Sequence, residues 1–244
     1  MPDVEPLLLT IAAITTRQQN QSLTNATGFF FRRGERLFLV TSRHVVIDEG
    51  AGHRPESLQI VLFDDAANLA STTGFSIPLY RDSEALWKQA SDSAGLIDVA
   101  VIEIDQAALP EPTVFTAFTP DTLCPSDAEV EVGTALMVVG FPLGFADTLH
   151  HLPVARQAGL ASSFGLRFQG MGYFLTDART HRGISGAPVV MRVDSGPASQ
   201  PEFHWQLLGV HSARLDVGTR DLQQDEALGL NCAWYADILL TLTE

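Results

Sequence analysis

The chain has 244 residues, 45% of them hydrophobic and 18% charged, which suits one large domain or two smaller ones with buried cores. Its formal net charge of −14 argues against nucleic acid as a partner, because phosphate backbones are bound by Lys and Arg, and it also disfavours anionic membranes. No run of about twenty apolar residues is present to span a bilayer.

Short strands are the dominant prediction along the chain. Residues 6–16 are predicted to form a first strand or a packing segment, and residues 83–94 a helical turn or loop. Residues 106–128 are rich in Pro and Thr without periodicity, so they are expected to connect two halves of the chain. Apolar residues at helical spacing predict a helix between Trp234 and Thr243. Apolar or alternating runs bounded by Gly, Pro, Asp or Ser predict the other strands at 28–33, 36–41, 57–63, 74–79, 97–104, 130–139, 153–161, 172–176, 187–193 and 205–213.

The two cysteines, Cys124 and Cys232, are too few for a disulfide framework in a chain of this length, although the sequence allows a single disulfide between them. Cys232 lies in an apolar run and is interpreted as a small buried residue. The apolar N-terminal segment is preceded by acidic residues and by no Lys or Arg, so it lacks the basic start of a secretory signal. We therefore expect two free thiols and a cytoplasmic location.

A candidate nucleophile stands in the stretch Arg182-Gly183-Ile184-Ser185-Gly186-Ala187-Pro188. A serine between glycines, at the entrance of an apolar run, suits a reactive hydroxyl at the mouth of a strand. Gly183 allows a backbone conformation closed to other residues, which aims the N–H groups of Gly183 and Ser185 at one developing oxyanion. Such a stretch alone is weak evidence, because Gly and Ser are common in turns.

Two further segments supply partners for this serine. His44 follows the apolar strand 37–41, and Asp98 stands at the start of the apolar strand 97–104. A serine hydroxyl needs a base within hydrogen-bond reach, and the base needs an acceptor that fixes its tautomer. Each residue also has an ordinary structural interpretation, as a turn histidine and as an aspartate that ends a strand. Their joint occurrence with Ser185, in the order His, Asp, Ser, favours a catalytic triad.

These segments resemble the chymotrypsin-like serine proteases. Three segments are similar to the family's histidine, aspartate and nucleophile segments: L-V-T-S-R-H-V-V, D-V-A-V and G-I-S-G-A-P, respectively. Residues 176–186 and the G-F-P-L-G segment at 140–144 are similar to the bacterial Deg proteases, and the resemblance spans roughly residues 26–240. It implies an all-β fold of two antiparallel six-stranded barrels with a C-terminal helix, divided into residues 1–118 with His44 and Asp98, and residues 119–244 with Ser185.

The resemblance implies a serine endopeptidase that acts on polypeptides without cofactor or metal. His44 would be the base, Asp98 its orienting carboxylate, and Ser212 the serine that approaches the aspartate. The main alternative is a degenerate member that kept the triad but binds a peptide strand in the groove between barrels. Ester hydrolysis also stays open, although the nucleophile elbow of α/β-hydrolases is absent, because position 187 is Ala and the order of the three residues differs.

Two departures from the family concern activation. Ile184 stands where digestive members carry an aspartate that pairs with a freshly cut N-terminus, and Met1-Pro2-Asp3 is typical of an uncut start. Zymogen activation by N-terminal cleavage is therefore not expected. No residues remain after the second barrel for the peptide-binding domain of Deg proteases, so we expect regulation to be absent or to come from a protein partner that supplies activation.

Specificity is predicted from two positions that line the family's pocket. Thr180 and His211 at these positions are similar to the glutamyl endopeptidases of this fold, where both bind the P1 carboxylate. A hydroxyl and an imidazole N–H are suitable donors for a Glu or Gln side chain. Arg179, where basic-specific members carry an acidic residue, adds positive potential nearby. The alternatives are a packed histidine with an ordinary turn threonine, and the Deg-like preference for small apolar P1 side chains.

Overall fold

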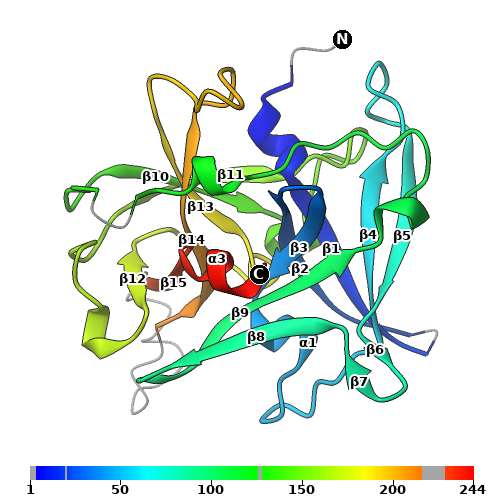
Figure 1. Ribbon diagram of the computed structural model, residues 1–244, viewed down its shortest axis with the longest axis horizontal. Helices are drawn as coiled ribbons and strands as arrows, with labels where there is room; N and C mark the ends of the chain where they lie inside the picture. The colour runs from blue at the N-terminus through cyan, green and yellow to red at the C-terminus, as the bar shows by residue number, and fades with distance from the viewer. Residues whose placement is uncertain (1–3, 20, 126–127, 216–228) are drawn as a thin grey trace.

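The computed structural model describes residues 4–19, 21–125, 128–215 and 229–244, and the chain folds into two antiparallel sheets (Figure 1). The N-terminal sheet has seven strands in the order β5-β4-β1-β2-β3-β9-β8. Before it, residues Pro6–Thr10 form a 3₁₀ turn. Its strands are β1 (Ile11–Gln18), β2 (Gln21–Arg33), β3 (Arg36–Thr41), β4 (Ser57–Phe63), β5 (Thr72–Pro78), β8 (Trp87–Asp92) and β9 (Gly95–Ile104), and a small hairpin of β6 (Tyr80–Arg81) and β7 (Glu84–Ala85) lies beside them.

The C-terminal sheet has six strands in the order β11-β10-β13-β14-β15-β12. A short helix, α3 (Ile238–Leu242), follows the last strand and packs on β8 and β9 of the other sheet. The strands are β10 (Ala135–Gly140), β11 (Val154–Gly159), β12 (Tyr173–Thr176), β13 (Pro188–Arg192), β14 (Trp205–Arg214) and β15 (Asn231–Tyr235). The all-β class and the small C-terminal helix expected from the sequence are confirmed.

Three local predictions were wrong. The segment 83–94 is not a helical turn or loop but contains β7 and β8, and β8 gives the N-terminal sheet a seventh strand where six were expected. Its sequence has little strand propensity, and the strand forms because it pairs with the strongly apolar β9. The expected C-terminal helix begins four residues late, because Trp234 and Tyr235 belong to β15 and pair with β12 and β14. The division of the chain at residue 118 stays a prediction.

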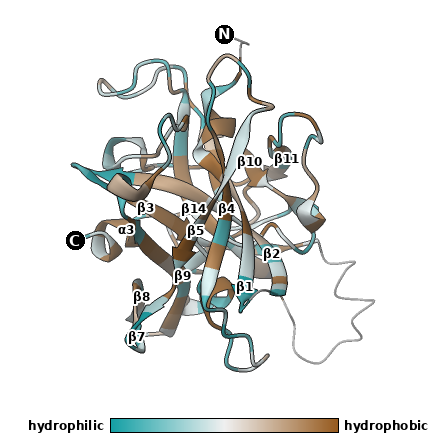
Figure 2. Ribbon diagram, turned by 90° about the vertical axis from the view of Figure 1, so that its right-hand side faces the viewer, coloured by the Kyte–Doolittle hydropathy of each residue, from teal (hydrophilic) through white to brown (hydrophobic). Residues whose placement is uncertain are grey.

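A shared hydrophobic core joins the two sheets. Hydrophobic residues gather on the strands inside the molecule (Figure 2). Phe118, in the connection after β9, is fully buried, and its ring makes edge contacts with Phe29 of β2 and with Phe203 just before β14. Its backbone exchanges hydrogen bonds with Phe30 and Arg32 of β2. The connection is therefore part of the core.

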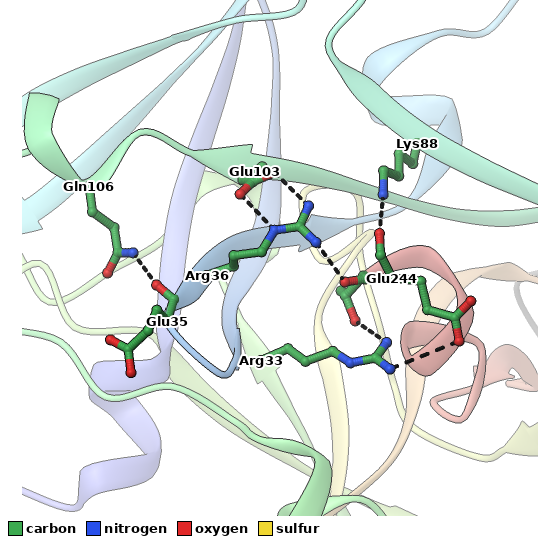
Figure 3. A network of polar contacts seen from close by, with 8 residues as sticks. Arg33, Glu35, Arg36, Lys88, Glu103, Gln106 and Glu244 are labelled. Carbon is green, nitrogen blue, oxygen red and sulfur yellow. Dashed lines mark hydrogen bonds and ion pairs between the residues drawn. The ribbon is translucent and has the colours of Figure 1, made fainter.

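Cations of the N-terminal sheet hold the end of α3 (Figure 3). Arg36 makes a two-bond contact with Glu103, at 2.8 and 2.7 Å, and its third nitrogen donates to the carbonyl of Thr243 at 3.2 Å. Arg33 donates to the carbonyl of Leu240, and Lys88 donates to the main-chain oxygen of Glu244 at 2.8 Å. The carbonyls at the end of a helix carry partial negative charge, so these cations fix α3 against β2, β3 and β8.

Cys124 and Cys232 are both free, as predicted, and Cys232 is buried, as also predicted. Cys124 is buried too, and burial raises the pKa of each thiol to about 11. In the described part of the chain, no helix has both the length and the apolar character needed to cross a membrane.

We expect Phe118→Ala to lower the free energy of unfolding by about 3–5 kcal/mol, because it leaves a cavity where three aromatic rings meet. Denaturant unfolding followed by tryptophan fluorescence measures the change. Leu166→Ala is the control: its side chain is 70% exposed, so the loss should stay within about 0.5 kcal/mol. Equal effects of the two substitutions would contradict the assignment of Phe118 to the shared core.

Candidate active site

His44 lies on a short turn that its apolar neighbours anchor. The strand β3 ends at Thr41, and the helical turn α1 (Arg43–Val46) follows at once. Val45 and Val46 are buried, whereas the side chain of His44 is 35% exposed. The two valines thus turn the imidazole toward the surface.

Asp98 lies beside this turn because of the strand register. Thr41 of β3 pairs with Ala100 of β9, which places Asp98 two residues beyond the pair, next to α1. One carboxylate oxygen of Asp98 accepts from the backbone N–H of His44 at 2.9 Å, and the other lies 2.7 Å from His44 Nδ1. A carboxylate accepts hydrogen bonds, so this contact favours the tautomer in which Nδ1 carries the proton and Nε2 is free to accept another.

The C-terminal sheet supplies a third donor to the same carboxylate. Ser212 of β14 is 5% exposed, and its hydroxyl donates to Asp98 Oδ2 at 2.5 Å. The structure thus joins His44, Asp98 and Ser212 by hydrogen bonds. Asp98 receives hydrogen bonds from both halves of the chain.

Opposing effects act on the His44 imidazole. Burial is the largest and favours the neutral ring, whereas the hydrogen bond and charge of Asp98, with a smaller attraction from Asp48, favour the protonated one. Together they raise the pKa of His44 above its ordinary value of 6.5. The site therefore stabilises a proton on this ring.

Ser185 lies in the loop between β12 and β13, where two glycines hold an unusual backbone. Gly183 has a φ of +92° and Gly186 a φ of +85°. A Cβ on Gly183 would stand 2.6 Å from the carbonyl oxygen of Phe141, and one on Gly186 would collide with Thr27 and Thr41. Both positions therefore require glycine, as the sequence predicted for Gly183. The loop is wedged between the turn after β10 and the strands β2 and β3.

The Ser185 loop meets the His44 turn at one carbonyl group. The oxygen of His211 accepts from Gly186 N at 2.8 Å and from Ser42 Oγ at 3.1 Å. Ser42 is two residues before His44, and Gly186 follows Ser185. Among the described residues, the Ser185 hydroxyl itself makes no hydrogen bond, so the two loops are adjacent while the two side chains are not joined.

The N–H groups of Gly183 and Ser185 also have no hydrogen-bond acceptor among the described residues. The peptide group between Arg182 and Gly183 is fixed by a hydrogen bond, because Leu143 N donates to the carbonyl of Arg182 at 2.5 Å. In a trans peptide the C=O and the next N–H point in opposite directions, so this bond turns the N–H of Gly183 away from Leu143. Two backbone donors are thus available near the serine.

The residues proposed for specificity differ in their surroundings. Thr180 is 7% exposed, and its hydroxyl donates to Asn231 Oδ1 at 2.5 Å. Its proton is therefore already used. Asn231, which the sequence did not point to, also donates to the carbonyl of Ala178 at 2.6 Å and so fixes the segment that leads to Ser185. The sequence feature that could have pointed to Asn231 is its position as a polar residue inside the apolar run 230–234. Arg179 is exposed.

His211 is 2% exposed, and its Nδ1 has no hydrogen-bond partner among the described residues. Burial, and after it the charge of His44, lower the pKa of His211 to about 4, although Asp98 acts weakly in the other direction. The ring is therefore neutral at neutral pH. A buried polar atom without a partner is costly, and this nitrogen is itself closed to solvent, so a ligand reaches it only when the groups around it move.

Residues 26–195, more than half of the chain, match a family model described as a trypsin-like peptidase domain. Among solved structures the protein is similar to the serine endoprotease from Yersinia pestis, with a TM-score of 0.54 and 13% sequence identity. The match covers 100% of this chain and 66% of that one, so the chain spans just under two thirds of its length. At this identity the likeness establishes the fold, a double β-barrel with a small C-terminal helix. No curated protein sequence matches.

We expect Asp98→Asn to lower the pKa of His44, because the substitution removes the charge that favours the protonated ring and leaves the burial that opposes it. Titration of the histidine ring signals by NMR measures the shift. Asp147→Asn is a matched control, because the Asp147 carboxylate faces His150 Nδ1 at 2.6 Å and should leave His44 unaffected.

The same pair predicts the sign of a stability change. A pKa raised in the folded state adds stability that is fully present below the unfolded pKa and is lost as the pH rises through the folded one. The difference in unfolding free energy between wild type and Asp98→Asn should therefore shrink with rising pH. An unchanged His44 titration in Asp98→Asn would contradict this account of the pair.

Proposed function

The chain belongs to the trypsin-like peptidase family, and we propose that it is a serine endopeptidase with Ser185 as nucleophile, His44 as base and Asp98 as the orienting carboxylate. The observation that supports this most is the double contact of Asp98 with His44, through the backbone N–H and through Nδ1. This contact leaves Nε2 of His44 as the free acceptor. The turn that carries His44 is linked to the Ser185 loop, because both donate to the carbonyl of His211.

In the proposed mechanism, the oxygen of Ser185 attacks the carbonyl carbon of a peptide bond while His44 Nε2 takes the hydroxyl proton. The electron pair of the C=O bond moves to oxygen, and the N–H groups of Gly183 and Ser185 bind this oxyanion. His44 then gives the proton to the leaving amine as the C–N bond breaks. Water, activated by the same imidazole, hydrolyses the acyl-enzyme. Asp98 orients the ring and stabilises its charge without taking the proton.

We further infer that the enzyme cleaves after Glu or Gln. The support is His211, a buried and neutral imidazole with an unpartnered nitrogen at a position where the family binds the P1 side chain. Thr180 contributes a donor only if its hydroxyl leaves Asn231, so the proposal depends mainly on His211. A buried carboxylate needs donors, and a neutral imidazole supplies one N–H.

Ser185→Ala should lower kcat by on the order of 10⁶-fold, since triad members act as a unit and the nucleophilic oxygen is lost. It should also abolish covalent labelling by a fluorophosphonate, which requires an activated serine. Both are measured on protein whose circular dichroism matches wild type.

The control is Ser163→Ala, an exposed serine of the same half of the chain, which should label and hydrolyse like wild type. If wild type and Ser185→Ala label alike, or if wild type does not label at all, the endopeptidase proposal is wrong. A well-folded protein that binds peptides in the groove but never labels would favour the degenerate binding module instead.

His211→Ala should reduce kcat/KM for a Glu substrate by ~10²-fold or more, because it leaves a desolvated carboxylate short of a donor. The same variant should change kcat/KM for an apolar P1 substrate by less than about threefold. A peptide library digested by wild type provides the substrates. Cleavage mainly after Val, Leu or Ala would refute the acidic pocket and favour the Deg-like preference. Cleavage after Arg or Lys would refute both.

A further inference from the structure

Thr27 is a buried threonine of β2 whose hydrogen bonds lead to the nucleophile loop. It is 0% exposed and pairs with Ala13 of β1 on one side. On the other side the ladder with β3 begins only at Phe29. The backbone groups of Thr27 are therefore free to bond outside the sheet.

The backbone of Thr27 uses this freedom on the Ser185 side. Its N–H donates to the carbonyl of Ser185 at 3.0 Å, and its own carbonyl accepts from Thr41 Oγ1 at 2.8 Å. Thr41 is three residues before His44. The backbone of Thr27 thus contacts the segments that carry the proposed nucleophile and base.

The hydroxyl of Thr27 is fully used as well. It donates to the carbonyl of Gly183 at 2.8 Å and accepts from Phe141 N at 3.0 Å. The first bond fixes the peptide plane between Gly183 and Ile184. The second ties the turn after β10, whose Leu143 fixes the plane before Gly183. The peptide planes before and after Gly183 are thus each fixed by a hydrogen bond to their carbonyl group.

We propose that Thr27 is a positioning residue that holds the nucleophile loop from the opposite barrel, so that the N–H groups of Gly183 and Ser185 face one oxyanion. The inference rests on the proposed endopeptidase function. A hydrogen bond from a fixed hydroxyl keeps the Gly183 carbonyl in place, and through the rigid peptide it constrains the direction of the donors on either side. Among the described residues, Thr27 makes no hydrogen bond with His44.

The test compares Thr27→Val, which keeps the shape and loses the hydroxyl, with Thr10→Val. Thr10 is equally buried and donates to the carbonyl of Leu7 at 2.7 Å, outside the candidate site. The two substitutions should lower the Tm by similar amounts. Only Thr27→Val should lower kcat, by at least ~10-fold, since complete loss of one oxyanion donor costs about 10²–10³-fold. Its KM should change less than about threefold, and the midpoint of its pH–rate profile, which reports His44, should not move.

A second pair keeps the test decisive if Thr27→Val does not fold. Thr27→Ser and Thr27→Ala both lose the methyl group, and only Thr27→Ser keeps the hydroxyl, so kcat of Thr27→Ser should exceed that of Thr27→Ala by ~10-fold or more. Equal kcat values in the hydroxyl-bearing and hydroxyl-free variants overturn the positioning role and leave the endopeptidase function standing. Absence of fluorophosphonate labelling in wild type overturns both.

Discussion

The carboxylate of Asp98 is the point on which the candidate site depends. Its two oxygens receive three hydrogen bonds, two from His44 in the N-terminal half and one from Ser212 in the C-terminal half. In a chain with a net charge of −14, a partly buried carboxylate is stable only where donors are aimed at it. The donor set is complete only when the two sheets pack together. The shared core around Phe118 and the hydrogen bonds from Arg and Lys side chains to the end of α3 therefore support the site as well as the fold.

The nucleophile loop follows the same principle. It belongs to the C-terminal half, yet Thr27 of β2 bonds to the carbonyls of Gly183 and Ser185, and Gly186 packs so tightly on Thr27 and Thr41 that a Cβ does not fit. Its backbone conformation, which only glycine adopts without strain at residues 183 and 186, is fixed by surrounding groups from several directions. Thr27 thus holds the Ser185 loop from the N-terminal half, and Ser212 holds Asp98 from the C-terminal half.

The sequence predicted those parts of the structure that depend on local pattern. Every expected strand overlaps an observed one, and the motif segments located His44, Asp98 and Ser212 because each stands at the edge of an apolar strand or on it. It failed for β8, which has little strand propensity of its own and becomes a strand by pairing with the adjacent β9. It also failed for β15, whose partners β12 and β14 come from earlier parts of the chain. Thr27 and Asn231 were missed for a similar reason: their bonds cross 156 and 51 residues of sequence, and no spacing rule connects such positions. Residue type predicted Thr180 as a donor but not the direction of its hydroxyl.

The two histidines of the site differ because only one of them has an acidic partner in contact. Burial, which is partial for His44 and nearly complete for His211, disfavours the charged form of both rings. Asp98 reverses this effect for His44, whereas His211 has burial and the charge of His44 against protonation, and its pKa falls to about 4. A proton taken from Ser185 in the proposed mechanism therefore stays on His44, where the leaving amine needs it. His211 stays neutral and offers one N–H without a charge. A neutral donor binds the carbonyl oxygen of a Gln amide by the same contact as a Glu carboxylate, so discrimination between Glu and Gln must come from residues other than His211.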